Sequence, residues 1–156
     1  MSTPIEWTDE TWNPTRGCRR VSPGCENCYA EDIAYRFSGP GLPYEGLIQL
    51  GKSGPRWNGA ARFADDVLLQ PLGWRTPKLI FVNSMSDLFY DGFSDAQIDQ
   101  VWAVMLLTPW HTHQVVTKRP ERAARYLNDP TLYSRVLEAA TKIRSARRGR
   151  KHGPDG

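Results

Sequence analysis

Two short apolar segments, each followed at once by a polar loop and a helical pattern, constrain the fold of this chain most. Residues 78–83, KLIFVN, and residues 113–117, HQVVT, have the length and the β-branched content of buried strands. Residues 96–107 lie between them and carry a helical stripe that Ser94 or Asp95 would cap. Alternation of strand and helix indicates an α/β fold with parallel strands.

The flanking regions extend this alternation. We predict a first strand within residues 5–14, a weaker strand at 66–70, and helices over 28–37, 118–127 and 131–146. Together these elements predict an α/β fold with a partial parallel (β/α) barrel-like sheet of about three to four strands and flanking helices.

The charge of the chain is unevenly distributed. Residues 135–156 carry seven Lys or Arg and two Asp or Glu, whereas residues 1–134 carry 13 and 15. We predict a single α/β domain over residues 1–146 and a basic, disordered tail over 147–156. Such a tail either binds nucleic-acid phosphates or is simply solvated. The sequence contains no apolar run of about 18 residues, so it predicts no membrane span. The N-terminal residues do not resemble a secretory signal, and with three cysteines this indicates the cytoplasm.

All three cysteines lie within residues 18–28, in a loop rich in Gly and Pro. Cys18, Cys25 and Cys28 are therefore predicted to form one metal-binding loop. Three alternatives fit this spacing. The thiols are inert and buried, or they bind zinc with a fourth ligand from His111, His113 or a carboxylate, or they hold an iron–sulfur cluster with one open iron. If His111 and His113 do not bind zinc, we interpret them as structural residues.

Three ordered motifs resemble one known family. WNPTRGCRRVSPGCENCYAE, KLIFVNSMSDLFYDGF and HTHQVVTKRPERAARYL are similar to segments of the phage Gp37/Gp68 family of three-cysteine-motif proteins, and the chain reads as a truncated or short member. That family is itself similar to radical S-adenosylmethionine enzymes. The resemblance implies a [4Fe-4S] cluster on Cys18, Cys25 and Cys28, with S-adenosylmethionine bound at the open iron.

The motifs depart from the radical-enzyme pattern at several positions. The first cysteine gap is six residues rather than three, and Asn27 stands where an aromatic residue often precedes the last cysteine, with Tyr29 on its other side. Asn83, Ser84 and Asp87 replace the turn that often holds the methionine amino group. These five side chains are the residues that we expect to bind the cofactor, together with Arg119.

We expect Asp87 and Lys118 to act in catalysis. Asp87 follows one predicted strand, and Lys118 and Arg119 follow the next, so parallel strands would bring both loops to the cysteine loop. The alternatives are that Asp87 caps its own loop and that Lys118 or Arg119 forms a structural ion pair with it. Arg56 and Trp57 either stack on a base or close a loop over the core.

Two functions from different classes follow. The first is an iron–sulfur enzyme similar to radical S-adenosylmethionine enzymes, with an unknown substrate and weak or no activity alone. The second is a non-catalytic module, stabilised by zinc or a cluster, that binds nucleic acid or a host protein. Three or four strands leave a radical site open to water at the sheet edge. Self-association would close it, as would the partner protein named for the three-cysteine motif. This partner is often encoded beside family members.

Overall fold

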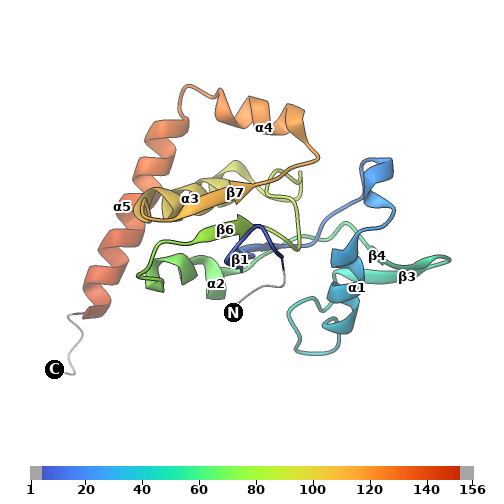
Figure 1. Ribbon diagram of the computed structural model, residues 1–156. Helices are drawn as coiled ribbons and strands as arrows, with labels where there is room; N and C mark the ends of the chain where they lie inside the picture. Colours follow the sequence, from blue (N-terminus) through green and yellow to red (C-terminus); the bar gives the residue numbers. More distant parts are fainter. Residues whose placement is uncertain (1–4, 152–156) are drawn as a thin grey trace.

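A three-stranded parallel sheet forms the centre of the molecule. The computed structural model describes residues 5–151. Its strands β1 (Glu10–Trp12), β6 (Leu79–Val82) and β7 (Thr112–Val115) lie in the order β1-β6-β7, and both pairings are parallel. Figure 1 shows the sheet with helices beside it. The predicted α/β class with about three strands is confirmed.

Helices α3 (Asp95–Leu107), α4 (Pro120–Leu127) and α5 (Leu132–Lys151) pack together with one face of the sheet. The start of α3 is fixed by a capping box, in which Ser94 and Gln97 bond each other's backbone amides. Alternate residues of β6 face this core: Ile80 and Val82 are buried with Trp12, Ile98 and Val101.

The other face of the sheet is only partly covered. Phe81 is half-buried, and Val116, just after β7, is exposed. The sequence predicted buried-type strands, and this is true of one face of β6 only, because every second side chain of a strand points away from the helices.

A smaller lobe packs at the carboxyl ends of the strands. It consists of α1 (Tyr29–Arg36) and a hairpin of β3 (Ile48–Gly51) and β4 (Gly54–Trp57). Strands β2 (Thr15–Arg16) and β5 (Arg62–Phe63) form a separate antiparallel pair. A second core holds the lobe together. Its buried members are Ala30, Ala34, Tyr44, Leu47, Trp57 and Met85. The arrowheads of β6 and β7 point toward this lobe in Figure 1.

Two sequence predictions differ from the structure. The strand predicted at 66–70 is wrong: helix α2 (Asp65–Leu68) and the 3-10 helix η2 (Gln70–Gly73) occupy this segment, since two acidic residues favour a first helical turn and Pro71 disfavours a strand interior. Helix α5 continues to Lys151, five residues past the predicted domain boundary. The rest of the predicted tail, 152–156, lies outside the described residues.

None of the described helices is long and apolar enough to cross a membrane.

Candidate metal and cofactor site

The loops that follow the three parallel strands meet at one cavity. It has a volume of about 160 Å³ and opens where the sheet meets the lobe. The predicted site residues that line it are Cys18, Cys25, Cys28, Tyr29, Asn83, Ser84, Asp87, Lys118 and Arg119. The convergence expected from parallel strands is confirmed for these residues. Asn27 is exposed and is not among the residues lining this cavity.

The three cysteines reach the cavity from separate local structures. Cys18 follows β2, Cys25 ends the 3-10 helix η1 (Pro23–Cys25), and Cys28 is the N-cap of α1. None of them forms a disulfide. Gly17 directs the chain into this loop with φ +92°, and a Cβ there would lie 2.1 Å from the carbonyl oxygen of Ala60. A residue with a side chain at position 17 would therefore collide with the backbone of Ala60.

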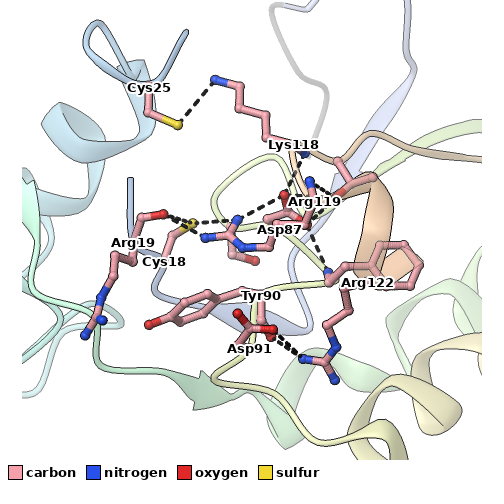
Figure 2. A network of polar contacts seen from close by, with 12 residues as sticks. Cys18, Arg19, Cys25, Asp87, Tyr90, Asp91, Lys118, Arg119 and Arg122 are labelled. Atoms are coloured by element: carbon pink, nitrogen blue, oxygen red, sulfur yellow. Dashed lines mark hydrogen bonds and ion pairs between the residues drawn. The ribbon is translucent and has the colours of Figure 1, made fainter. Parts of the chain in front are cut away.

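Two of the thiols have a cation beside them. The Nζ of Lys118 lies 3.8 Å from the Sγ of Cys25, and Nη1 of Arg119 lies 3.7 Å from the Sγ of Cys18, as Figure 2 shows. Burial raises the pKa of Cys18, and the Arg119 charge opposes this rise only in part. Burial also acts to raise the pKa of Cys25, but hydrogen bonds at Val21 and Ser22 and the Lys118 charge together lower it.

Asp87 ties two of the loops together. Its carboxylate accepts hydrogen bonds from the Thr117 hydroxyl and from the backbone amides of Phe89 and Lys118. Nη1 of Arg119 completes the set at 3.1 Å, and both side chains of this pair are nine-tenths buried. The carboxylate therefore positions the loops, in agreement with the ion-pair alternative. Its catalytic role remains a prediction.

Arg119 is held in place by further contacts. Its Nη2 donates to the carbonyl oxygen of Arg19 at 2.7 Å, and its guanidinium lies 4.8 Å from the ring centre of Tyr90. One side chain thus joins the β7 loop to Asp87 and to the cysteine loop. By contrast, Lys118 is exposed and its ammonium donates to the Gly24 carbonyl beside Cys25. Figure 2 shows the two cations pointing to different cysteines.

Asn83 has a strained backbone and an unused donor. Its φ of 61° is the only positive value at a non-glycine position among residues 5–151, and the residue is 3% exposed. Its Oδ1 accepts from the amide of Thr15, whereas its Nδ2 has no hydrogen-bond partner. A buried donor without an acceptor costs about 1–3 kcal/mol. Strain and an unpaired donor together are typical of functional sites.

Tyr29 and Ser84 connect α1 to the loop after β6. The Tyr29 hydroxyl donates to the Ser84 carbonyl oxygen at 2.9 Å, and burial raises the pKa of Tyr29. The Ser84 hydroxyl and the Met85 amide both bond Oδ1 of Asn13. Asn13 and Thr117 were not predicted as site residues, although Asn13 directly follows β1 and Thr117 lies two residues after the end of β7. That position was the available signal.

The two histidines lie at the amino end of β7, away from the cysteines. His111 bonds the Pro71 carbonyl oxygen, and His113 bonds the Thr108 hydroxyl. These contacts favour the structural interpretation. Trp57 is buried in the core of the lobe, which favours loop closure over base stacking for the Arg56–Trp57 pair.

The three thiols line one cavity, but the described residues contain no site for a single metal ion. Among residues 5–151 no group of three or more His, Cys, Asp or Glu side chains is close enough to hold a single metal ion. Tetrahedral zinc needs sulfurs about 3.8 Å apart, because each Zn–S bond is about 2.3 Å. A cluster binds each thiolate through a different iron and so accepts a wider spacing. Three free thiols around one cavity match that requirement in number and chemistry.

Comparison with known proteins identifies a family whose function is unknown. The model of DUF5131, described as a protein of unknown function, matches residues 2–147. No curated protein and no solved structure matches the chain. Membership of the Gp37/Gp68 family therefore remains a prediction.

Proposed function

Because this chain belongs to DUF5131, a family of unknown function, we propose its activity from the site: it is an iron–sulfur protein similar to radical S-adenosylmethionine enzymes. The observation that carries the proposal is the arrangement of three free thiols around one cavity at the carboxyl ends of parallel strands. Cys18, Cys25 and Cys28 would hold the [4Fe-4S] cluster. Three ligands leave one iron free for S-adenosylmethionine.

The charges of the cavity support an anionic group. Thiolates and sulfides give a cluster net negative charge, and Lys118 and Arg119 stand within 4 Å of two of the sulfurs. When bound and reduced, such a cluster supplies the electron that cleaves S-adenosylmethionine to methionine and a carbon radical. The chain's own contribution is to hold the cofactor and exclude water.

This proposal keeps the predicted binding roles of Tyr29, Asn83 and Ser84 and leaves out Asn27, which does not line the cavity. Asn83 and Ser84 follow β6 directly and, with Tyr29, line the cavity wall next to the thiols. Lys118 is exposed and carries its ammonium on a long, flexible side chain, so it would contact the cofactor or move a proton at its Nζ. Asp87 and Arg119 hold the loops in register through their buried ion pair.

A non-catalytic zinc module is the competing function. It needs a fourth ligand and closely spaced sulfurs, but His111 and His113 bond backbone and side-chain groups at the other end of β7. Nothing in the described structure favours zinc over a cluster.

The test is metal analysis after anaerobic purification. We expect about four iron and four sulfide per chain, a brown colour, and an EPR signal after dithionite reduction that changes when S-adenosylmethionine is added. Changing any one of the three cysteines to Ala should remove the iron, whereas Val21→Ala, in the same loop, should keep it. A colourless chain with one zinc would overturn the proposal.

The isolated chain should cleave S-adenosylmethionine poorly. The face of the sheet beside the thiols is partly open to solvent, and radical chemistry needs a site closed to water. Self-association or a three-cysteine-motif partner would close it. Many turnovers by the monomer would contradict this part of the proposal.

A further inference from the structure

A second cavity lies on the partly covered face of the sheet. It has a volume of about 610 Å³, and we refer to it as the sheet groove. Small-molecule sites usually measure about 300–1,000 Å³, so the groove is large enough for one. The three cysteines line the cavity of about 160 Å³ described above, here called the thiol cavity, and none of them lines the sheet groove. The groove is therefore a candidate site of its own.

The floor of the sheet groove is set by the pairing of two strands. Glu10 and Trp12 of β1 are buried, so the side chain of Thr11 between them points to the other face of the sheet. Its partner in the register is Phe81 of β6, and both residues line the groove. Because hydrogen-bonded strands carry these side chains, the floor is formed before any ligand binds.

The walls of the sheet groove are largely apolar and aromatic. Trp7 is 48% exposed, and its ring centre lies 4.7 Å from that of Phe81. Ile33 of α1 and Val116 after β7 add exposed branched side chains. Two rings and two aliphatic side chains around an open cavity favour a ligand with a flat aromatic ring.

The charge of the sheet groove restricts the ligand further. No Asp, Glu, Lys or Arg is among the described residues that line it. A charged molecule that entered would give up water without gaining an ion pair, which is unfavourable. The groove therefore favours an uncharged molecule, whereas the thiol cavity, with Lys118 and Arg119 in its walls, favours an anion.

Asn13 provides a hydrogen-bond donor in the same wall. Its Oδ1 accepts from the Ser84 hydroxyl at 3.2 Å and from the Met85 amide at 2.9 Å, and these two bonds fix the orientation of the side-chain amide. Its Nδ2 bonds no group among residues 5–151 and, unlike Nδ2 of Asn83, is not a buried atom without a partner. A neutral oxygen of a ligand can accept from it while the existing bonds of Asn13 stay in place.

We propose that the sheet groove binds an uncharged molecule that has a flat aromatic ring and a carbonyl or similar neutral oxygen. The ring lies against Trp7 and Phe81, and the oxygen accepts from Nδ2 of Asn13. The site uses neither the thiols nor a cluster, so this inference goes beyond the function proposed above and does not rest on it.

The experiment is calorimetric titration of the full chain, as purified, with indole-3-acetamide and indole-3-acetate. The two probes share a ring and a carbonyl oxygen and differ in charge. We expect the amide to bind one site at least about tenfold more tightly, because the acetate brings a charge into a groove without a cation. Equal affinity for the two probes, or no binding at about 1 mM, would overturn the proposal.

Asn13→Asp tests the donor. It keeps an oxygen for Ser84 and Met85 but replaces Nδ2 with a negative charge, so indole-3-acetamide should bind at least about fivefold more weakly. Tryptamine, the cationic probe with the same side-chain length, should bind more tightly to this variant than to the unchanged chain, which a loss of folding would not produce. Unchanged affinities for both probes would show that Asn13 does not contact the ligand and would overturn the proposal.

Two aromatic variants place the ligand in the groove. Trp7→Ala should weaken indole-3-acetamide at least about fivefold, whereas Tyr133→Ala, which removes a 75% exposed ring on α5, should not. No effect of Trp7→Ala would overturn the proposal. A dimer that binds none of the probes and becomes monomeric with Trp7→Ala would assign the groove to a second copy of the chain, and would also overturn it. Because no titration measures iron, these outcomes and the outcome of the metal analysis are independent.

Discussion

Replacing Arg119 with Met should destabilise the fold more than any surface ion-pair change in this chain. Methionine keeps the unbranched apolar stem but removes the charge and every donor. The side chains of Arg119 and Asp87 are each 9% exposed, and their ion pair measures 3.1 Å. The change therefore leaves the buried Asp87 carboxylate without its only side-chain cation in the described structure.

The magnitude follows from what Asp87 keeps. Breaking a buried pair by removing one partner costs about 3–5 kcal/mol. Asp87 retains the Thr117 hydroxyl and the amides of Phe89 and Lys118, which offset part of this. Loss of the contact with Tyr90 adds about 1 kcal/mol. We therefore expect a loss of about 2–4 kcal/mol in the free energy of unfolding.

The assay is urea denaturation of the metal-free protein, followed by circular dichroism. Lys142→Met is the matched control, since its ion pair with Glu138 is 74% and 67% exposed and contributes at most about 0.5 kcal/mol. Asp87→Asn in both backgrounds completes a double-mutant cycle. If Arg119→Met cost no more than Lys142→Met, the inference that this pair holds the loops together would be wrong.

Two further predictions concern other parts of the chain. Gly17→Ala should destabilise the protein by more than about 2 kcal/mol, because its Cβ would meet Ala60 at a positive φ. Gly149→Ala, whose Cβ would have no atom within 4 Å, should stabilise the protein slightly. Melting temperatures that shift equally in the two variants would contradict the steric argument. Burial, aided by nearby His111, lowers the pKa of His113 from 6.5 to about 4. Between these pH values the unfolded chain binds a proton on His113 that the folded chain does not bind. The free energy of unfolding should therefore fall by about 1–2 kcal/mol as the pH falls from 6.5 to 4. His113→Gln should remove that part of the pH dependence, which urea titrations at several pH values would measure.

The sequence is sufficient to predict the central elements because their signals are local. Apolar runs define β6 and β7, and Ser94 with Gln97 defines the start of α3. Their parallel arrangement then places the loops after them at one edge, and the thiol cavity lies there. The positions of Lys118 and Asp87 near the cysteines follow from this topology alone.

The parts that were missed depend on contacts between distant residues. The β3–β4 hairpin has no alternating apolar pattern, and its place is set by packing of Trp57 on the lobe core. Segment 66–70 forms a helical turn whose Val67 carbonyl accepts from the Trp12 indole, a partner that lies 55 residues away. An apolar run such as 78–83 also gives no indication that only one face of its strand is covered.

The candidate site divides into a fixed part and an open part, and this division bears on where chemistry can occur. Asp87, Thr117 and Arg119 bond one another and the backbone, so none of them offers a free group to a ligand without breaking the contact between two loops. Asn83 and Lys118 differ, since one has an unpaired amide donor and the other an exposed ammonium. The sequence predicted that Asp87 and Lys118 act in catalysis, but the Asp87 carboxylate is bonded to Thr117 and Arg119, whereas the Lys118 ammonium is exposed. In the proposed function, the bonds among Asp87, Thr117 and Arg119 would keep the loops in place, so that the exposed Lys118 ammonium meets the cofactor from a preorganised position.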